Sequence, residues 1–342
     1  MSYNYFFIRT PIQYYNALEA MQYFNSHNGN RLIVISDYPP SIEQIEKLID
    51  RKIWSDIYMP WRSQSKYTKY KVVNKLFNIT RPLLLGRIVK KIKTKDKIFW
   101  GNYNSIWLRY FLTKKRNKVT VLDDGFATLS IPETLKNDTL FFKTSKGISG
   151  VTERIFVSKS ASIPLKRLEF FTSFKNIAKA VTERSISCEY NYLKTLSKTI
   201  QPLKKEVYFI GQPLILLSLM SKESYIKQVD LVFNYYKNKG LKCYYIPHRS
   251  ALHDYFPKNW DIVYFNFPLE NLVLQENHEL PEIFASFYSS ALYYVNKFSS
   301  IDGLKFEFWK SKDFDGFSNV VRCFEYIKKE NLNNTTIHKI DC

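Results

Sequence analysis

The sequence has no uninterrupted apolar run approaching the roughly twenty residues that a membrane-spanning helix requires. Cysteine is also scarce: Cys188, Cys243, Cys323 and Cys342 are widely separated and form neither a CxxC pair nor a disulfide framework. The N-terminus lacks the basic region, apolar core and small-residue cleavage site of a secretory signal. These absences argue against an integral membrane protein or a secreted disulfide scaffold, and we expect a cytoplasmic protein with reduced cysteines.

Internal repeats, low-complexity tracts and the signatures of common nucleic-acid-binding domains are missing as well. Positive charge is abundant: 51 Lys and Arg residues against 31 Asp and Glu give a formal net charge of +20. This excess implies an anionic partner, such as a phosphorylated substrate, a membrane surface or a nucleic acid. Without a recognition motif we expect no nucleic-acid partner. A basic protein that stacks single strands on its many Tyr and Phe rings is the alternative from a different class.

A chain of 342 residues with 45% hydrophobic content is long enough for two domains, each with its own core. Short apolar runs alternate with helical patterns through the first half, which is the sequence form of βα units around a parallel sheet. Strands are predicted at 5–8, 32–35, 98–100 and 119–122, and helices at 12–24, 41–48, 69–92 and 105–114. Thr10 is predicted to cap the first helix, with Pro11 at its opening position.

The alternation loosens after residue 124 and resumes in the second half. Shorter β-like pieces are predicted at 140–143 and 154–157, and a polar helix at 177–199. A linker is placed at 201–205, and further strands at 207–210, 243–246, 263–265 and 283–286. The pattern therefore predicts an α/β protein with two Rossmann-like domains, residues 1–200 and 201–342.

Two carboxylates and a glycine, Asp123, Asp124 and Gly125, directly follow the strand predicted at 119–122. Reactive groups of open α/β domains lie just past the carboxyl ends of strands. Adjacent carboxylates disfavour joint ionisation, and partial burial raises a pKa further, which suits a general base for an acceptor hydroxyl. The alternative is an ordinary Asp-Gly turn.

A histidine lies between Pro247 and Arg249 after the strand predicted at 243–246. The His248 imidazole can donate a proton or a hydrogen bond to a phosphate, and the guanidinium beside it can bind phosphate oxygens bidentately. The alternatives are that His248 is merely solvated, or that His253 is the active histidine.

Paired hydroxyls, Ser289 and Ser290, follow the strand predicted at 283–286, where a helix is expected to begin. Serines together with the free backbone N–H groups of a helix N-terminus form an anion site that needs no metal. The alternative is a plain serine N-cap.

The order of acid pair, histidine and paired serines resembles that of bacterial sialyltransferases, specifically glycosyltransferase family 52, with kinship to the capsular polysialyltransferases. That group has an Asp/Glu-Asp/Glu-Gly motif, a His-Pro motif and a Ser/Thr pair in the same sequence. Looser similarities extend the resemblance: the opening Thr10-Pro-x-Gln13, the Gly211-x-Pro after the first strand of the second half, and the acidic helix start at Glu270.

Two positions depart from the family's pattern. Arg249 stands where the family has a proline after the histidine, and Leu214 stands where some members carry an acid assigned as the base. The base is therefore placed at Asp123, as related families with a working acid pair imply, with Asp124 as its rival.

The resemblance implies a GT-B-like fold, in which two Rossmann-like domains face a central cleft, with the acceptor on the first domain and the donor on the second. It implies an inverting, metal-independent enzyme without a cofactor. Such an enzyme moves sialic acid, or a related nonulosonic acid, from a CMP-sugar to a hydroxyl of a lipopolysaccharide, O-antigen or capsule acceptor. Hydrogen-bonding side chains can replace a metal because CMP leaves with a single phosphate.

The same resemblance also implies which residues bind the donor and which contact the acceptor. The residues that hold the donor are His248, which also protonates the phosphate, with Gly211, Pro247, Arg249, Glu270, Ser289 and Ser290. Glu270 would accept hydrogen bonds from the ribose or the cytosine. The residues that contact the acceptor or the sugar are Thr10, Gln13 and Gly125. The rival enzyme class is another GT-B glycosyltransferase that uses a nucleoside-diphosphate sugar.

A basic segment at 66–97 surrounds apolar residues at 83–85 and 88–89. A basic amphipathic helix on the anionic cytoplasmic face of the inner membrane would bring the enzyme to a lipid-linked acceptor. A solvated basic face over an ordinary core is the alternative.

Overall fold

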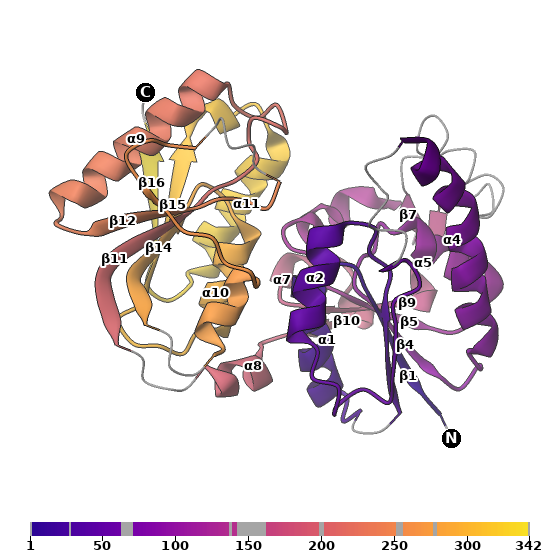
Figure 1. Cartoon of the computed structure of the whole chain (residues 1–342). Coiled ribbons are helices and arrows are strands. Elements are labelled where there is room, and N and C mark those ends of the chain that lie inside the picture. The colour runs from indigo at the N-terminus through magenta and orange to yellow at the C-terminus, as the bar shows by residue number, and fades with distance from the viewer. Residues whose placement is uncertain are drawn as a thin grey trace. The chain divides into compact units, whose positions relative to one another are not determined.

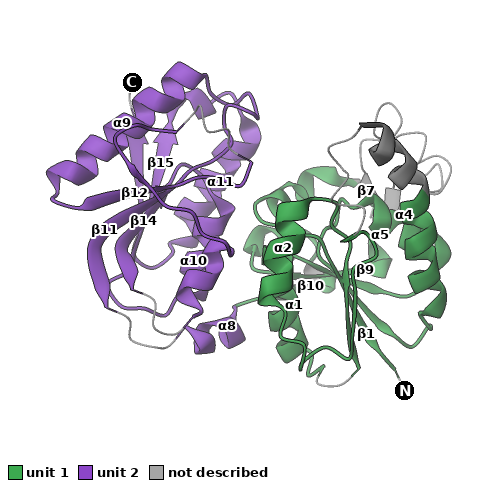
Figure 2. Cartoon of the chain, in the orientation of Figure 1, with its two compact units in different colours: residues 1–189 green, residues 190–342 purple. Residues whose placement is uncertain are grey.

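The structure of the protein is a computed structural model (Figure 1). It describes residues 2–26, 29–62, 71–136, 139–141, 162–197, 202–250, 256–275 and 279–340. The chain forms two compact units, residues 1–189 and 190–342 (Figure 2). Leu203, inside the predicted linker, already belongs to strand β11 (Leu203–Ile210) of the second unit.

Unit 1 contains a seven-stranded sheet with the strand order β10-β9-β5-β4-β1-β2-β3, in which every pairing is parallel. Its strands are β1 (Asn4–Ile8), β2 (Asn30–Val34), β3 (Asp56–Tyr58), β4 (Lys97–Trp100), β5 (Val119–Leu122), β9 (Leu168–Thr172) and β10 (Ser185–Ser187). The four strands predicted in this half are confirmed as β1, β2, β4 and β5.

Helices lie on both faces of this sheet (Figure 1). They are α1 (Pro11–Tyr23), α2 (Pro39–Leu48), α4 (Lys71–Lys91), α5 (Ile106–Lys114) and the short α7 (Lys175–Ala180). The four helices predicted in this half are confirmed, and Pro11 does open the first of them. Thr10 is its N-cap residue, but the threonine side chain forms no capping hydrogen bond.

The helix predicted at 177–199 is wrong. That segment contains the end of α7, strand β10 and the short helix α8 (Asn191–Leu196). Elements of three and six residues contain too few positions to show a strand or helix period, so the sequence pattern could not separate them.

A small antiparallel sheet is formed by β6 (Leu135–Lys136), β7 (Thr139–Phe141) and β8 (Ser162–Pro164). Strand β7 confirms the beginning of the β-like piece predicted at 140–143. The piece predicted at 154–157 lies outside the described residues.

The central strands of unit 1 are buried on both faces, which is why they read as continuous apolar runs. Phe6 and Phe7 of β1 point to opposite faces and stack on their register partners in β4. The ring centroids are 4.4 Å apart for Phe6 and Phe99, and 4.2 Å apart for Phe7 and Trp100. These stacked pairs fix the register between β1 and β4.

Unit 2 contains a six-stranded parallel sheet with the order β13-β12-β11-β14-β15-β16. Besides β11, its strands are β12 (Lys242–Ile246), β13 (Asp261–Ile262), β14 (Leu280–Ser286), β15 (Lys305–Ser311) and β16 (Thr335–Ile340). Its longer helices are α9 (Lys222–Asn238), α10 (Ser290–Phe298) and α11 (Ser318–Glu330). The predicted β11, β12 and β14 are confirmed, β13 precedes the predicted position at 263–265, and β15 and β16 were not predicted.

Both sheets have the doubly wound order in which the direction of strand addition reverses beside the first strand. The reversal lies between β1 and β4 in unit 1 and between β11 and β14 in unit 2. Ligands of such sheets bind outside the carboxyl ends of the strands at this point. The strand order alone therefore directs attention to the residues that follow these four strands.

Candidate active site

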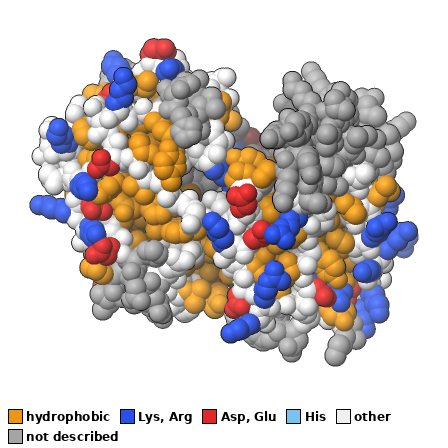
Figure 3. Space-filling model, viewed as in Figure 1, with side chains coloured by type: hydrophobic (Ala, Val, Ile, Leu, Met, Phe, Trp, Pro, Cys, Tyr) orange, Lys and Arg blue, Asp and Glu red, His pale blue; other side chains and the backbone are white. Residues whose placement is uncertain are grey.

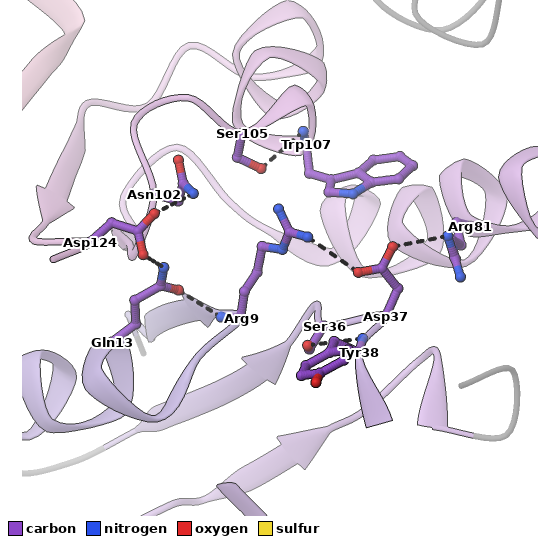
Figure 4. Close-up of polar contacts among 10 residues, drawn as sticks. All are labelled: Arg9, Gln13, Ser36, Asp37, Tyr38, Arg81, Asn102, Ser105, Trp107 and Asp124. Carbon is purple, nitrogen blue, oxygen red and sulfur yellow. Dashed lines mark hydrogen bonds and ion pairs between the residues drawn. The ribbon is translucent and has the colours of Figure 1, made fainter. Parts of the chain in front are cut away.

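Asp124 is the centre of a polar cluster at the carboxyl edge of the unit 1 sheet (Figure 4). Gln13 of α1 donates a hydrogen bond through Nε2 to Asp124 Oδ1 at 2.5 Å. Asn102, which follows β4, donates through Nδ2 to Asp124 Oδ2 at 2.5 Å. The backbone N–H of Asp124 donates to Thr128 Oγ1 at 2.9 Å. The carboxyl group is thus held from both sides by elements that meet at the β1–β4 reversal.

Gln13 is itself fixed, with only 1% of its surface exposed. Its Oε1 accepts a hydrogen bond from the backbone N–H of Arg9 at 2.7 Å. Gly101 leaves room for this side chain, since a Cβ at that position would lie 2.5 Å from Gln13 Oε1. The amide therefore has one orientation, with its donor toward Asp124.

Burial raises the pKa of Asp124 above its ordinary value, because a low-dielectric environment disfavours the carboxylate. The hydrogen bond from Gln13, the positive charge of Arg9 and the hydrogen bond from Asn102 offset only part of this effect. A raised pKa makes the ionised carboxylate a better proton acceptor than an exposed aspartate.

Asp123 is 1% exposed and has different partners from Asp124. Its Oδ2 accepts hydrogen bonds from the backbone N–H and the hydroxyl of Ser173, at 2.8 and 2.9 Å, and its carbonyl oxygen accepts one from Asn16. The Asp123 carboxylate therefore connects β5 to the loop after β9. Gly125 follows with φ +63°, so an Asp-Gly turn and a polar site are both present.

In Figure 4, Arg9 lies between the Asp124 cluster and a second group of charges. Asp37, just after β2, pairs through Oδ1 with Arg9 at 3.2 Å and through Oδ2 with Arg81 of α4 at 3.3 Å. Arg81 is 4% exposed, and its guanidinium lies 5.6 Å from the ring centroid of Trp61.

Sequence reasoning missed Arg9, Asp37, Arg81, Asn102 and Ser173. Four of them, Arg9, Asp37, Asn102 and Ser173, follow within three residues of a strand end, so the rule that directed attention to Asp124 could have found them. For Thr10, which was predicted to contact the acceptor or the sugar, the structure describes a buried Oγ1 with no hydrogen-bond partner among the described residues.

In unit 2, His248 follows β12 and forms a local contact with Ser250. Its Nδ1 accepts a hydrogen bond from the Ser250 backbone N–H at 3.2 Å and lies 2.7 Å from the Ser250 hydroxyl. Nδ1 is therefore the unprotonated nitrogen, and Nε2 carries the hydrogen. Burial, and then the charge of Arg249, lower the pKa of His248 to about 4, so the imidazole is a neutral donor at pH 7. His253 lies outside the described residues.

Glu270 lies in the 3₁₀ helix η6 (Leu269–Val273) and is 7% exposed. Burial raises the pKa of Glu270 to about 7, an effect that its own backbone hydrogen bond and the charge of Arg249 only partly offset. The effect of Arg249 on this pKa shows that Arg249 and Glu270 lie within electrostatic reach of each other. Since η6 also packs against α10, Glu270 belongs to the same part of unit 2 as the serine pair.

Ser289 is the N-cap residue of α10, and its side chain forms no capping hydrogen bond. Ser289 is 8% exposed and Ser290 is half-buried at the first helical position. The loop before them is held by Gln212, whose Oε1 accepts from the backbone N–H of Tyr288 at 2.9 Å. Because the Ser289 hydroxyl is not used for capping, it is available to a ligand at the helix N-terminus.

Gly211 has a packing role that the sequence did not reveal. A Cβ at this position would lie 2.2 Å from the hydroxyl oxygen of Tyr245, which is hydrogen-bonded to Tyr225 at 2.7 Å. Pro247, which directly follows β12, is half-buried, and Leu214 is fully buried. In the described ranges, no group of three or more His, Cys, Asp or Glu side chains is arranged to hold a metal ion.

The sequence matches the family model described as glycosyltransferase family 52 over residues 61–307, which is more than half of the chain. The chain belongs to glycosyltransferase family 52. Comparison with curated proteins finds no match.

Two solved structures show that this family 52 enzyme has a GT-B glycosyltransferase fold. One is an α/β-galactoside α-2,3-sialyltransferase from the luminous marine bacterium Photobacterium phosphoreum. It is 12% identical, each chain covers 98% of the other, and the TM-score is 0.53. The other is TcCGT1 in complex with UDP, which is 10% identical with a TM-score of 0.52, covering 100% of this chain and 86% of that one.

Where its side chains are described, the basic segment of the glycosyltransferase is a helix with a buried apolar face and with Arg87, Lys90 and Lys91 exposed. Leu85, Ile88 and Val89 are buried, Arg81 is buried, and Leu83 is 59% exposed. On the face shown in Figure 3, Lys and Arg side chains are scattered over both units among apolar and acidic ones. No helix in the described part of the chain is long and apolar enough to cross a membrane. Membrane contact stays a prediction, and this packing favours the alternative of a solvated basic face.

Proposed function

We propose that this glycosyltransferase moves sialic acid, or a related nonulosonic acid, from a CMP-sugar to a hydroxyl of a surface glycan, with inversion and without a metal. The observation that carries the proposal is the chemistry at the carboxyl edges of the two sheets. In unit 1 this edge bears a carboxyl with a raised pKa held by two amides. In unit 2 it bears a neutral histidine and a serine hydroxyl at a helix N-terminus that is not used for capping.

The carboxylate that meets the acceptor is Asp124 in this proposal, not Asp123. Asp123 already binds the Ser173 backbone and hydroxyl and is 1% exposed, whereas Asp124 is half-buried at the sheet edge. Asp124 takes the proton of the acceptor hydroxyl while the hydroxyl oxygen forms a bond to the anomeric carbon of the donor sugar. The fold likeness to a protein described as a sialyltransferase supports this choice of donor sugar.

The leaving group in this proposal is the single phosphate of CMP. As the bond between the anomeric carbon and the phosphate oxygen breaks, negative charge develops on that oxygen. His248 Nε2–H, the Ser289 and Ser290 hydroxyls and the first N–H groups of α10 donate hydrogen bonds to the phosphate. Arg249 contributes positive charge. These donors supply the stabilisation for which nucleoside-diphosphate enzymes often use a divalent cation.

The donor and the metal requirement are tested together. We expect nucleotide release from CMP-Neu5Ac in the presence of EDTA and a glycan acceptor, and none from UDP-glucose or UDP-galactose, because the site offers donors for one phosphate. Coupled assays of free CMP and UDP measure the two reactions. Release of UDP, or a loss of CMP release that added Mg²⁺ restores, would contradict the proposal.

Glu270 makes donor binding depend on pH. Its pKa of about 7 means that the ionised form gains population as pH rises through neutrality. If this carboxylate accepts hydrogen bonds from the ribose or the cytosine amine, CMP affinity should rise between pH 6 and 8, by up to about tenfold per unit below the pKa.

Titration calorimetry with CMP at several pH values measures this dependence. Because Gln does not ionise, Glu270→Gln should flatten it. CMP itself titrates near pH 6, and the difference between the two proteins removes that contribution. Identical pH profiles for both proteins would exclude Glu270 from donor binding.

A further inference from the structure

Arg9 presents a guanidinium with unused donors at the same sheet edge as the proposed base. Its side chain is 37% exposed, and in the described ranges its ion-pair partner is Asp37, at 3.2 Å through one terminal nitrogen. A guanidinium has five N–H donors in a planar fork. Figure 4 shows the remaining edge of this fork directed away from Asp37. Donors are therefore left over for a ligand.

Arg9 does not have its counter-charge to itself. Asp37 is shared between Arg9 and the buried Arg81. The Asp124 carboxyl is instead held by the Gln13 and Asn102 amides. Arg9, the more exposed of the two guanidinium groups, is thus only partly neutralised at the sheet edge where the acceptor is proposed to bind.

A single side chain connects Arg9 to the base. Gln13 accepts from the Arg9 backbone N–H at 2.7 Å and donates to Asp124 at 2.5 Å. The charge of Arg9 also acts directly on the pKa of Asp124. The Arg9 backbone is thus hydrogen-bonded into the Asp124 cluster, and the Arg9 guanidinium lies within electrostatic reach of Asp124. A group bound to Arg9 would therefore lie at the same sheet edge as the hydroxyl that Asp124 would deprotonate.

From this geometry we propose that Arg9 binds an anionic group of the acceptor, so that the enzyme's acceptors are acidic glycans bearing a carboxylate or a phosphate near the reacting hydroxyl. The inference rests on the proposed function, because it takes Asp124 as the group that meets the acceptor. Asp37 orients Arg9 and is also paired with Arg81, which leaves part of the charge of Arg9 for the substrate.

The test compares matched acceptors: a neutral oligosaccharide, and the same oligosaccharide ending in a uronic or sialic acid or carrying a phosphate. The wild-type enzyme should prefer the acidic acceptors by about 10- to 100-fold in kcat/KM, the range of one charged hydrogen-bonded contact. Arg9→Gln should bring this ratio close to one, and Arg9→Lys should retain part of it. The ratio cancels any effect of Arg9 on Asp124, since both acceptors use the same base.

Arg62 provides a matched control, because it is an arginine of the same unit paired with a carboxylate, Glu46 of α2, at 2.5 Å. Arg62→Gln should keep the wild-type ratio. A wild-type enzyme with no preference for acidic acceptors, or an Arg9→Gln variant with an unchanged ratio, would overturn the inference.

A donor carboxylate is the competing anion. In that case Arg9→Gln would raise the KM for CMP-Neu5Ac and slow its hydrolysis without an acceptor, while the acceptor ratio stayed the same. Failure of the proposed function is a separate result, namely no CMP release with any acceptor. Saturation-transfer NMR with the acidic and neutral oligosaccharides would then still measure whether Arg9 binds the anion.

Discussion

Replacing Asp124 with asparagine is expected to lower kcat by about 10²- to 10⁴-fold, the contribution of a general base. The amide cannot take the proton of the acceptor hydroxyl. Initial rates of CMP release at saturating donor and acceptor measure this effect, and a thermal melt shows whether the variant is folded. A loss smaller than tenfold in a folded variant would remove Asp124 from the base role.

The neighbouring carboxylate is the natural comparison. Asp123→Asn should lose more stability than turnover, because the buried hydrogen bonds to Ser173 involve a charged acceptor worth about 1.5–3 kcal/mol each. The denaturation midpoint should therefore fall clearly. If Asp123→Asn is instead inactive at full stability while Asp124→Asn stays active, the base is the residue that the sequence resemblance placed first.

The pH profile gives an independent check on the same group. Because the pKa of Asp124 is raised, the fraction of ionised base falls as pH decreases through that raised value. The acidic limb of the kcat/KM profile should therefore lie above the ordinary aspartate range. Arg9→Gln removes a charge that lowers this pKa, so it should move the limb to higher pH.

Replacing His248 with alanine is expected to lower kcat by about 10²- to 10³-fold, since one donor to a developing negative charge is lost. His248→Gln, which keeps an N–H donor, should recover part of the loss. A change of less than threefold for the alanine variant would show that the phosphate is held by other groups.

The protonation state of His248 predicts how many protons the protein exchanges with solvent when CMP binds. The pKa is lowered to about 4 in the free protein, so at pH 6 to 7 the ring is neutral before binding. A bound phosphate dianion raises the pKa of a neighbouring histidine. Calorimetry in buffers of different ionisation enthalpy should therefore show that the wild-type protein takes up more protons, or releases fewer, on CMP binding than His248→Ala does.

Much of the architecture could be read from the chain. Strands such as β1 and β5 are buried on both faces by helices, so they appear as continuous apolar runs that begin and end sharply. Polar residues directly after such runs fall at the carboxyl edge of the sheet, which is how Asp124, His248 and Ser289 were found. Strands β15 and β16 were missed, and β3 and β10 are only three residues long, too short for any period.

What the sequence by itself determined is the presence of two doubly wound halves and the strand ends that carry polar groups. It could not decide which of two adjacent acids faces the ligand, because neighbouring side chains point to opposite sides and the direction depends on β9 and α1 packing around them. Residues far apart in the sequence, Arg9, Asp37 and Arg81, share one ion-pair cluster. Only the tertiary structure, by aligning parallel strands in register, placed that cluster beside Asp124.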